Sequence, residues 1–546
     1  MKHKVLKVHP ADNVIVALSD LQKGETVGFQ GVDYVMQDRI QAKHKFFQQA
    51  MQAGDDVIMY GVLVGKTQSD IPAGGLMNTE NVKHAAQTYA YRNAHVSWTA
   101  PDVNKFMHRT FRGFHRSDGR VGTANYWLFI PTVFCENRNL DVIREAMHNE
   151  LGYAVTEKYK NYTRHLLEAF RKGDDLSLVD LSPSSIPGES RPFQNVDGIK
   201  FLNHQGGCGG TRQDSAILAK LLVAYADHPN VGGVTILSLG CQHLQVSDFK
   251  ADLLRHNPKF DKPLIILEQQ QSQSEEQLIG TAIRSTFEGL IGINKLERKT
   301  ASLDKLCIGV KCGGSDGFSG ISANPAVGYC ADLVVGLGGQ ILLAEFPELC
   351  GVEQELVDRS VSKETASKFI RLMQDYSQEA ERVGSGFHMN PSPGNIRDGL
   401  ITDAIKSAGA AKKGGSSPVV DVLDYTEPAT KPGLSLVCTP GNDVEATTGK
   451  AASGATLILF TTGLGTPTGN PVCPTIKVST NSTLTKRMGD IIDIDCGPVI
   501  DGEKTIEQMG EEILDYCIRA ASGDVIPKAV LLNQDDFIPW KRGVSL

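Results

Sequence analysis

Hydrophobic and polar positions divide the chain into two unlike parts. Over residues 1–97, short alternating apolar stretches are separated by closely spaced turn sequences such as Lys23-Gly24-Glu25 and Gly31-Val32-Asp33. Such spacing indicates a small domain built of short β-strands. Within it, the pattern of residues 44–52 predicts one amphipathic helix. A polar connector over residues 98–110 then leads to the rest of the chain.

From Tyr126 onward, apolar runs of strand length alternate with stretches of helical periodicity, which predicts mainly parallel sheets covered by helices. We therefore predict an α/β fold, in which the small β-rich domain precedes two α/β domains, residues 111–300 and 301–546. In the first, strands are predicted at residues 127–134, 198–203, 231–239 and 264–267, and helices at residues 139–151, 215–226 and 274–290. In the second, strands are predicted at residues 307–310, 333–335, 340–344, 434–437 and 456–460, and the longest helix at residues 363–382.

Two polar stretches interrupt this alternation. Residues 155–195 contain Ser182-Pro183-Ser184-Ser185 and are predicted to form an inserted helix with an exposed loop. Residues 410–418, rich in small and polar side chains, are predicted to form a flexible loop.

Composition narrows the class of protein. A chain of 546 residues is too long for one core, and its hydrophobic content of 41% and charged content of 22% are ordinary for a globular protein. The net charge of -8 argues against non-specific nucleic-acid binding, which needs a basic surface. No apolar run has the length of a membrane span. Without a secretory signal, we expect a cytoplasmic protein whose 11 cysteines are reduced thiols.

Four cysteines occupy positions that suit an active site. Cys135, Cys208, Cys241 and Cys312 are flanked by glycine or polar residues, and at least three of them follow apolar runs of strand type. Ligands of open α/β sheets bind outside the carboxyl ends of the strands. Gathered there, the four thiols could bind a soft or borderline metal. The alternative is that most are small buried apolar residues, the commonest environment of a free cysteine.

The densest functional segment begins at Lys311 and continues Cys-Gly-Gly-Ser-Asp. Its glycines expose backbone N–H groups that can hold an anion, and Ser315 and Asp316 are candidate catalytic residues. The alternative is that one of these two side chains only caps the following helix. Glu345 closes another predicted strand, where its carboxylate is a candidate metal ligand, base or ion-pair partner.

Histidine and basic residues complete the candidate site. His204 lies four residues before Cys208, although a single histidine is more often a satisfied core or surface residue. Arg116, Arg120 and Lys311 are candidates to neutralise a substrate carboxylate, with surface salt bridges as the alternative for the two arginines. Neither a P-loop nor a dinucleotide-binding glycine motif is present, so nucleotide binding is not expected.

Several longer motifs resemble those of one family, the altronate/galactarate dehydratases. They are RSDGRVGTANY at 116–126, HPNVGG at 228–233, Gly240-Cys241, CGGSD at 312–316, SANPAVG at 322–328 and PSPGN at 391–395. The resemblance runs from about residue 111 to 523. The N-terminal part is similar to the family's small β-clip (SAF-type) domain, with Lys43-His44-Lys45 and GVLVG at 61–65 in the expected places.

The resemblance implies a hydro-lyase of hexuronate catabolism that uses iron and converts D-altronate to 2-dehydro-3-deoxy-D-gluconate and water. Galactarate dehydration, or another 2-hydroxy-acid lyase, is the alternative within the class. An inactive sugar-acid-binding protein is the alternative outside it. The partners expected are a small sugar acid and a second copy of the chain in a homodimer, with no nucleic acid and no membrane.

Roles for individual residues follow from the resemblance and from the chemistry. A base must reach the C2 proton, and His204 or Glu345 is expected to serve. Asn125, Asn324 and Asn395 lie in the shared motifs and join the substrate-binding candidates. A set of three or four thiolates favours an iron–sulfur cluster over a single Fe(II) ion. The chain departs from the family at residues 76–81, where a His-x-His-Asn element is common, and at Ala124 and Gln242.

Overall fold

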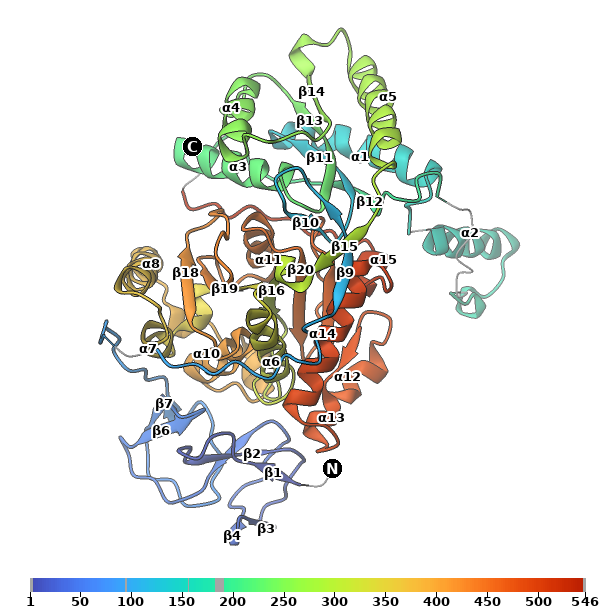
Figure 1. Ribbon diagram of the computed structural model, residues 1–546. Coiled ribbons are helices and arrows are strands. Elements are labelled where there is room, and N and C mark those ends of the chain that lie inside the picture. Colours follow the sequence, from blue (N-terminus) through green and yellow to red (C-terminus); the bar gives the residue numbers. More distant parts are fainter. Residues whose placement is uncertain (1–2, 94–95, 156, 182–190, 544–546) are drawn as a thin grey trace.

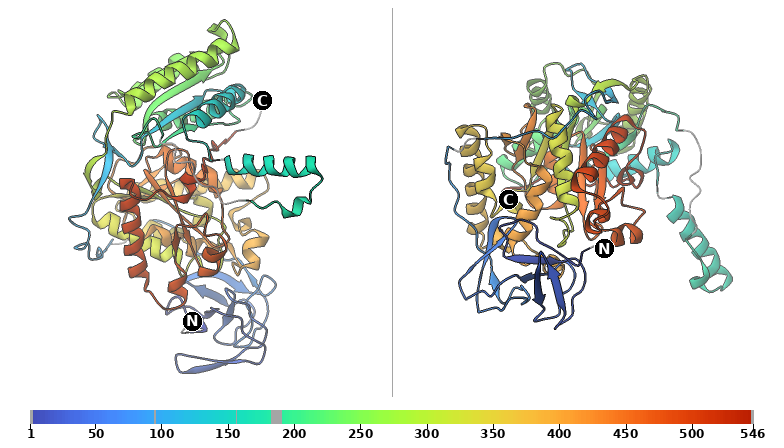
Figure 2. Two further views of the ribbon diagram at one scale, coloured as in Figure 1. Left: turned by 90° about the vertical axis from the view of Figure 1, so that its right-hand side faces the viewer. Right: turned by 60° about the horizontal axis from the view of Figure 1, so that its bottom comes forward.

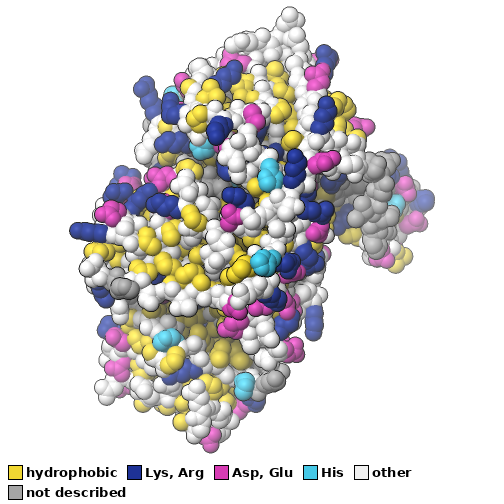
Figure 3. All heavy atoms as spheres, in the orientation of Figure 1, with side chains coloured by type: hydrophobic (Ala, Val, Ile, Leu, Met, Phe, Trp, Pro, Cys, Tyr) yellow, Lys and Arg dark blue, Asp and Glu magenta, His cyan; other side chains and the backbone are white. Residues whose placement is uncertain are grey.

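The computed structural model describes residues 3–93, 96–155, 157–181 and 191–543. Three bodies follow one another in space (Figure 1): the small N-terminal domain, the large C-terminal domain, and at the far end the second domain. Residues 537–543 run back from the C-terminal domain to the second domain (Figure 1), where the backbone N–H groups of Arg542 and Gly543 donate to Asp214. Acidic and basic side chains are interspersed over the face seen in Figure 3. No helix among the described residues is long and apolar enough to cross a membrane.

The N-terminal domain consists of short antiparallel strands, as predicted. They form the sheet β1-β2-β5, the sheet β6-β7-β8 and the hairpin β3-β4, with bounds Val5–Leu6, Val14–Ala17, Lys45–Phe47, Asp56–Met59, Val62–Thr67, Val82–Lys83, Thr26–Phe29 and Val32–Val35. The helix predicted over residues 44–52 is wrong. Lys45–Phe47 is the fully buried strand β5, because it pairs with β2 and inserts Phe46 into the core. Tertiary pairing overrides the local amphipathic pattern here.

The second domain is built on a four-stranded parallel sheet in the order β12-β11-β13-β14. Its strands are Gly198–Phe201, Tyr126–Pro131, Val231–Ser238 and Leu264–Glu268, and its helices are α1 Asn137–Glu150, α3 Arg212–Ala226, α4 Val246–His256 and α5 Glu275–Ile293. The four strands and the helices α1, α3 and α5 agree with the predicted elements, whereas α4 was not predicted. The central strands β11 and β13 are buried along their whole length, as expected for parallel strands covered on both faces.

A second small sheet lies where this domain meets the connector. Strand β9, Thr110–His115, pairs antiparallel with β10, Val121–Gly122, and with β15, Lys299–Ser302. Residues that begin and end the second domain are thereby held side by side.

The C-terminal domain contains a seven-stranded, entirely parallel sheet in the order β18-β19-β17-β16-β20-β21-β22. Its strands are Val419–Leu423, Gly433–Val437, Gln340–Ala344, Cys307–Cys312, Leu457–Thr462, Thr475–Ser479 and Ile494–Asp495. The helices used below are α6 Ala323–Gly336, α8 Lys363–Arg382, α9 Pro393–Arg397, α10 Asp403–Ala411, α11 Asp443–Ala452 and α14 Ile506–Ser522.

Two predictions in this domain are wrong. Residues 333–335 belong to helix α6, not to a strand, because a short apolar run cannot distinguish a strand from a buried helix. Residues 410–418 are not an open loop. Residues 410–414 form the end of α10 and the 3-10 turn η7, Lys412–Gly414, where Lys413 is fully buried, and only residues 415–418 are irregular.

The insertion begins with helix α2, Glu157–Lys172, as predicted. Figures 1 and 2 show it standing away from the body of the molecule, and Phe170 is 70% exposed. Residues 182–190 of the predicted loop lie outside the described part of the chain.

Candidate active site

The predicted site residues fall at three separate places. Seven lie at the carboxyl edge of the seven-stranded sheet or support it, namely Lys311, Cys312, Ser315, Asp316, Asn324, Glu345 and Asn395. Four lie beyond the carboxyl ends of strands in the second domain, namely Cys135, His204, Cys208 and Cys241. The remaining three, Arg116, Arg120 and Asn125, lie before the amino end of β11.

At the first place, side chains of opposite charge are packed together away from solvent. We call this set the buried charge cluster, and its members are Lys311, Glu345, Glu348, Lys406, Lys413, Asp443 and Lys450. They come from the ends of β16 and β17, from the 3-10 turn η5, Phe346–Leu349, that follows β17, and from α10, η7 and α11. All except Asp443 are less than 10% exposed. A parallel sheet collects the ends of its strands at one edge, and the cluster forms there.

Lys311 lies at the centre of the cluster and is fully occupied. Its ammonium group donates to Glu345 Oε1 and to the Cys312 carbonyl at 2.8 Å, and it lies 2.8 Å from Asp443 Oδ1. Two of its three N–H donors are thus used in hydrogen bonds, and the ion pair with Asp443 occupies a further side of the ammonium group. The prediction that Lys311 binds the substrate carboxylate therefore does not fit this geometry. Lys311 instead holds two carboxylates in place.

Glu345 adopts a left-handed backbone conformation with φ of 77°. This is uncommon for a residue with a side chain, and such strain is concentrated at functional sites. Its Oε1 accepts from Lys311, whereas its Oε2 lies 3.4 Å from Lys413 Nζ without a hydrogen bond. Burial and the neighbouring Glu348 raise the pKa of Glu345.

Several buried polar atoms of the cluster have no hydrogen-bond partner among the described residues. They are Glu345 Oε2, Glu348 Oε2, Lys413 Nζ and Lys450 Nζ, with Asn390 Nδ2 beside them. A buried polar atom without a partner costs about 1–3 kcal/mol. Donors and acceptors concentrated at one place indicate a site whose ligand supplies complementary groups.

The loop after β16 borders the cluster and is rigidly held. Cys312 Sγ and Ser315 Oγ are 2.6 Å apart, and Asn395 donates to the Ser315 carbonyl at 2.9 Å. Asn324 bridges Thr461 and the Gly409 carbonyl and is fully buried. Asn324 and Asn395 thus support the loop through its backbone and its neighbours. Gly313 leaves room for Asp443, since a Cβ there would lie 2.6 Å from its Oδ2.

The small domain reaches this loop directly. Lys43 Nζ lies 3.0 Å from both Asp316 Oδ2 and Asp398 Oδ1. Beside it, Lys45 is fully buried and donates to the Gly399 carbonyl at 2.6 Å, and His44 bonds the Arg397 carbonyl. Asp316 therefore joins the small domain to the edge of the site.

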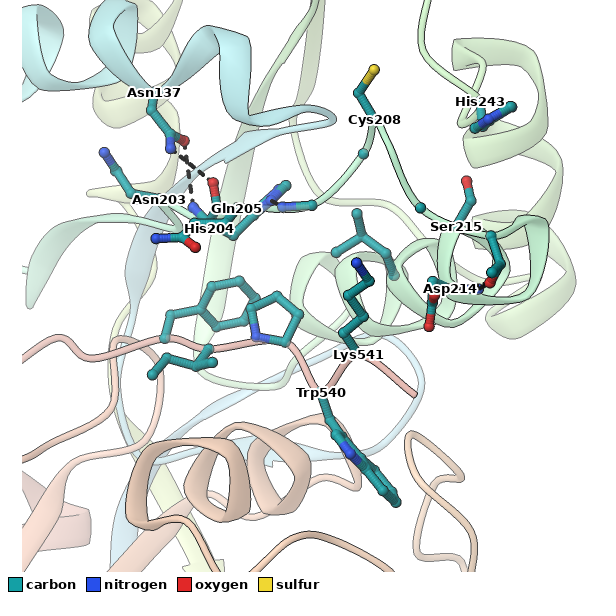
Figure 4. A pocket seen from close by; sticks show the side chains of 18 residues that line it. Asn137, Asn203, His204, Gln205, Cys208, Asp214, Ser215, His243, Trp540 and Lys541 are labelled. Carbon is teal, nitrogen blue, oxygen red and sulfur yellow. Dashed lines mark hydrogen bonds between the residues drawn. The ribbon is translucent and has the colours of Figure 1, made fainter. Parts of the chain in front are cut away.

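The second place is a pocket of about 540 Å³ in the second domain (Figure 4). It is lined by the glycine-rich loop after β12, by His243 and by the C-terminal segment 537–541. His204 donates from Nε2 to the Pro131 carbonyl at 2.8 Å and accepts at Nδ1 from the Gly206 N–H at 3.0 Å. Burial lowers its pKa to about 4. With both ring nitrogens engaged, His204 does not have the free nitrogen that a base requires.

The four cysteines do not form one set. Cys135, Cys208 and Cys241 are exposed at the ends of neighbouring strands, whereas Cys312 is buried in the other sheet. Figure 4 shows Cys208 pointing away from Trp540 and Lys541. Within the described residues, no group of three or more His, Cys, Asp or Glu side chains is arranged to hold a metal ion. The arrangement therefore contradicts a single four-thiolate site, and the described residues do not form a preassembled metal site.

The residues at the third place support the fold through bonds to other parts of the protein. Arg116 donates to the Pro229 carbonyl at 2.8 Å, and Arg120 pairs with Asp118 and Asp227 at 2.5 Å. Asn125 is fully buried and donates to two backbone carbonyls. These residues lie at the opposite edge of the sheet from the ligand-binding edge, which corrects the expectation that they bind substrate.

Sequence reasoning missed five members of the cluster: Glu348, Lys406, Lys413, Asp443 and Lys450. Lys413 lies in residues 410–418, which the sequence predicts as a flexible loop, and the sequence pattern assigns no role to the other four. One local signal was present, since Lys450 is the single charged residue in the small-residue stretch Ala446–Ser453. A lysine in such a stretch has no polar helix face to occupy.

The fold and the site define a three-domain α/β protein with a buried charged site at the carboxyl edge of a parallel sheet and a β-rich domain docked against it. The chain belongs to the altronate/galactarate dehydratase family. Models of three domains match in succession: the altronate/galactarate dehydratase SAF domain over residues 3–85, the D-galactarate dehydratase/altronate hydrolase second domain over residues 113–294, and the D-galactarate/altronate dehydratase C-terminal domain over residues 303–545.

Individual relatives are similar in sequence to this chain over nearly its whole length. The chain is 34% identical to the altronate dehydratase of Bacillus subtilis (strain 168) and 32% identical to that of Escherichia coli (strain K12), in each case over 99% of both chains. It is 29% identical to the galactarate dehydratase (L-threo-forming) of Escherichia coli (strain K12), over 95% of this chain and 92% of the relative. The resemblance read from the sequence motifs is confirmed.

Proposed function

We propose that the protein is a hydro-lyase that dehydrates a sugar acid, converting D-altronate to 2-dehydro-3-deoxy-D-gluconate and water. The observation that carries the proposal is the buried charge cluster with its unpartnered polar atoms, in a chain related over its full length to two altronate dehydratases. A polyhydroxy acid has the matching chemistry. Its hydroxyl groups donate to carboxylate oxygens such as Glu345 Oε2, and its carboxylate accepts from lysine.

Lys413 is the cation best placed for the substrate carboxylate. Its Nζ is buried, faces the cluster and makes no hydrogen bond among the described residues, whereas Lys311 already has three oxygens beside it. The C2 proton of a sugar acid becomes acidic only when the adjacent carboxylate is neutralised. A fixed ammonium group in a water-poor site stabilises the enediolate formed when that proton leaves.

That the protein uses iron is proposed from the family resemblance alone. If iron is bound, the exposed thiols Cys135, Cys208 and Cys241 would be its candidate ligands, and the metal would supply Lewis-acid chemistry. The described residues do not bring three such donors together.

Two substitutions in different domains test the cysteine ligands. If the second domain binds iron, Cys241→Ser removes it from anaerobically purified protein, and Cys312→Ser does not. Loss of iron only in Cys312→Ser would place the metal in the C-terminal domain. Iron content equal to the wild type in both variants contradicts cysteine ligation. The measurement is metal analysis by mass spectrometry.

The activity is tested with the two sugar acids of the relatives. Anaerobically purified, iron-loaded protein is incubated with D-altronate and separately with galactarate, and a 2-keto-3-deoxy product is assayed. Product from D-altronate alone is the expected result. Product from galactarate alone would move the assignment to that diacid, and product from neither would overturn the proposed function. A homodimer, a cytoplasmic location and a role in hexuronate catabolism remain predictions from the sequence.

A further inference from the structure

One lysine of the buried charge cluster has no anion to pair with. Lys450 lies on α11, the helix after β19, and its side chain is fully buried. The side chain passes over strand β16 at Gly309, where an added Cβ would lie 3.1 Å from Lys450 Cδ. Its Nζ has neither a hydrogen bond nor an ion pair among the residues that the structure describes.

The other three lysines account for all three carboxylates of the cluster. Lys406 pairs with Glu348 at 3.0 Å, and Lys413 lies 3.4 Å from Glu345. Lys311 pairs with both Glu345 and Asp443. Three cations therefore balance three anions, and a fourth ammonium group would be an uncompensated buried charge.

A buried amine without a counterion is most stable in its uncharged form. The groups that face Lys450 are Glu345 after β17, Glu348 from η5, Lys311 from β16 and Lys413 from η7. Burial is the largest influence and lowers the pKa of Lys450 to about 7, while Lys311 and Lys413 lower it further and the glutamates oppose this. Near neutral pH, Lys450 thus offers a free lone pair inside the site.

We propose that Lys450 is the base that removes the C2 proton of the sugar acid. The inference rests on the proposed function and names the residue that performs its first step. The amine lone pair of Lys450 bonds the proton, and the electrons of the C2–H bond pass into the carboxylate as an enediolate. The C3–O bond then breaks, a C2=C3 bond forms, and the departing hydroxide takes the proton from the Lys450 ammonium group and leaves as water, which restores the free amine. The resulting enol becomes the 2-keto group.

The alternatives in the cluster are less suited to this step. Glu345 is held by Lys311 through one oxygen and faces Lys413 with the other. Lys413 lies 3.4 Å from the Glu345 carboxylate and is the proposed partner of the substrate carboxylate. A base tuned close to the working pH is the most efficient proton acceptor, and Lys450 is the uncompensated amine of the cluster.

The first test compares two buried lysines of the same cluster. Lys450→Met is expected to lower kcat for D-altronate about 10²–10⁴-fold, the usual contribution of a general base, with KM little changed. Lys413→Met, which removes the proposed carboxylate partner, is expected to raise KM as well. Exchange of the substrate C2 hydrogen in D2O, measured by NMR, is expected to disappear in Lys450→Met.

The variant Lys450→Arg distinguishes a role of Lys450 as proton acceptor from a role as positive charge. Arginine keeps a positive charge but stays protonated at all working pH values, so Lys450→Arg is not expected to restore activity. Activity close to that of the wild type in Lys450→Arg would contradict the base role. The wild-type kcat/KM is expected to fall below a midpoint near pH 7, because protonation of Lys450 removes the lone pair.

Unfolding experiments give a readout that does not depend on activity. The pKa of Lys450 is lower in the folded chain than its ordinary value of 10.5, so between about pH 7 and 10.5 the unfolded chain binds more protons and stability rises with pH. Lys450→Met removes this contribution. It is therefore expected to be at least as stable as the wild type, with a gain in unfolding free energy larger at pH 7 than at pH 9.

The outcomes separate the two proposals. Wild-type protein that dehydrates neither D-altronate nor galactarate overturns the proposed function, and the Lys450 assignment with it. Active wild-type protein together with a folded, fully active Lys450→Met variant overturns the Lys450 assignment alone.

Discussion

The four buried lysines of the charge cluster differ in the number of anions that lie beside them. Lys311 contacts three oxygens, Lys406 is paired, Lys413 is partly paired and Lys450 has no anion. A buried ion pair is not by itself strong evidence of stabilisation, because desolvation opposes the attraction. Removing one member, however, leaves the other as an uncompensated charge. The arrangement is therefore sensitive to loss of any paired member.

Lys311→Met tests this sensitivity. The substitution removes one of the two lysines beside Glu345 and the lysine that pairs with Asp443. We therefore expect a loss of about 3–5 kcal/mol in unfolding free energy. Urea denaturation at pH 7 measures it. The control is Lys305→Met, whose pairing with Asp304 is on the surface and whose loss is expected to change stability by about 0.5 kcal/mol or less. Equal effects of the two substitutions would contradict the structural role of Lys311.

At the scale of elements, the site depends on where strands end. The ends of β16 and β17 carry Lys311 and Glu345 to one edge of the sheet, and α11 and η7 bring Lys450 and Lys413 there from more than 65 residues away along the chain. Long apolar strands and the helix over residues 363–382 were predictable because their periodicity is strong. Residues 333–335 and 44–52 were not, because burial in α6 and pairing in β5 outweigh the local pattern.

At the scale of the whole molecule, the small domain closes against the site through backbone as well as charge. Gly317 follows Asp316 and donates its N–H to the Asp398 carbonyl at 2.8 Å. A Cβ at this position would lie 2.6 Å from the Lys43 carbonyl oxygen and 2.9 Å from that of Asp398. Glycine is therefore required where the two domains meet.

Gly317→Ala is expected to loosen the small domain and to lower dehydratase activity, because the clash involves backbone atoms on both sides. Limited proteolysis within residues 98–110, the connector, is expected to become faster, and amide exchange at Lys43 and Lys45 to increase. Gly280→Ala is the control: it lies in α5 with no atom within 4 Å of the added Cβ, and helix propensity there favours alanine by about 0.5–1 kcal/mol. Unchanged proteolysis of Gly317→Ala would contradict the required close approach.

The sequence by itself determined the α/β character of the chain, its β-rich N-terminal domain and the family, because apolar periodicity and motifs such as CGGSD are local properties. It also placed Ser315, Asp316 and Glu345 after strands, and the structure has them at the carboxyl edge of the sheet; their catalytic roles stay predictions. Only the tertiary structure separated Cys312 from the other three cysteines and moved Arg116, Arg120 and Asn125 away from that edge. Only it revealed Lys413 and Lys450 in the buried charge cluster, because the burial and pairing of a lysine depend on elements distant along the chain.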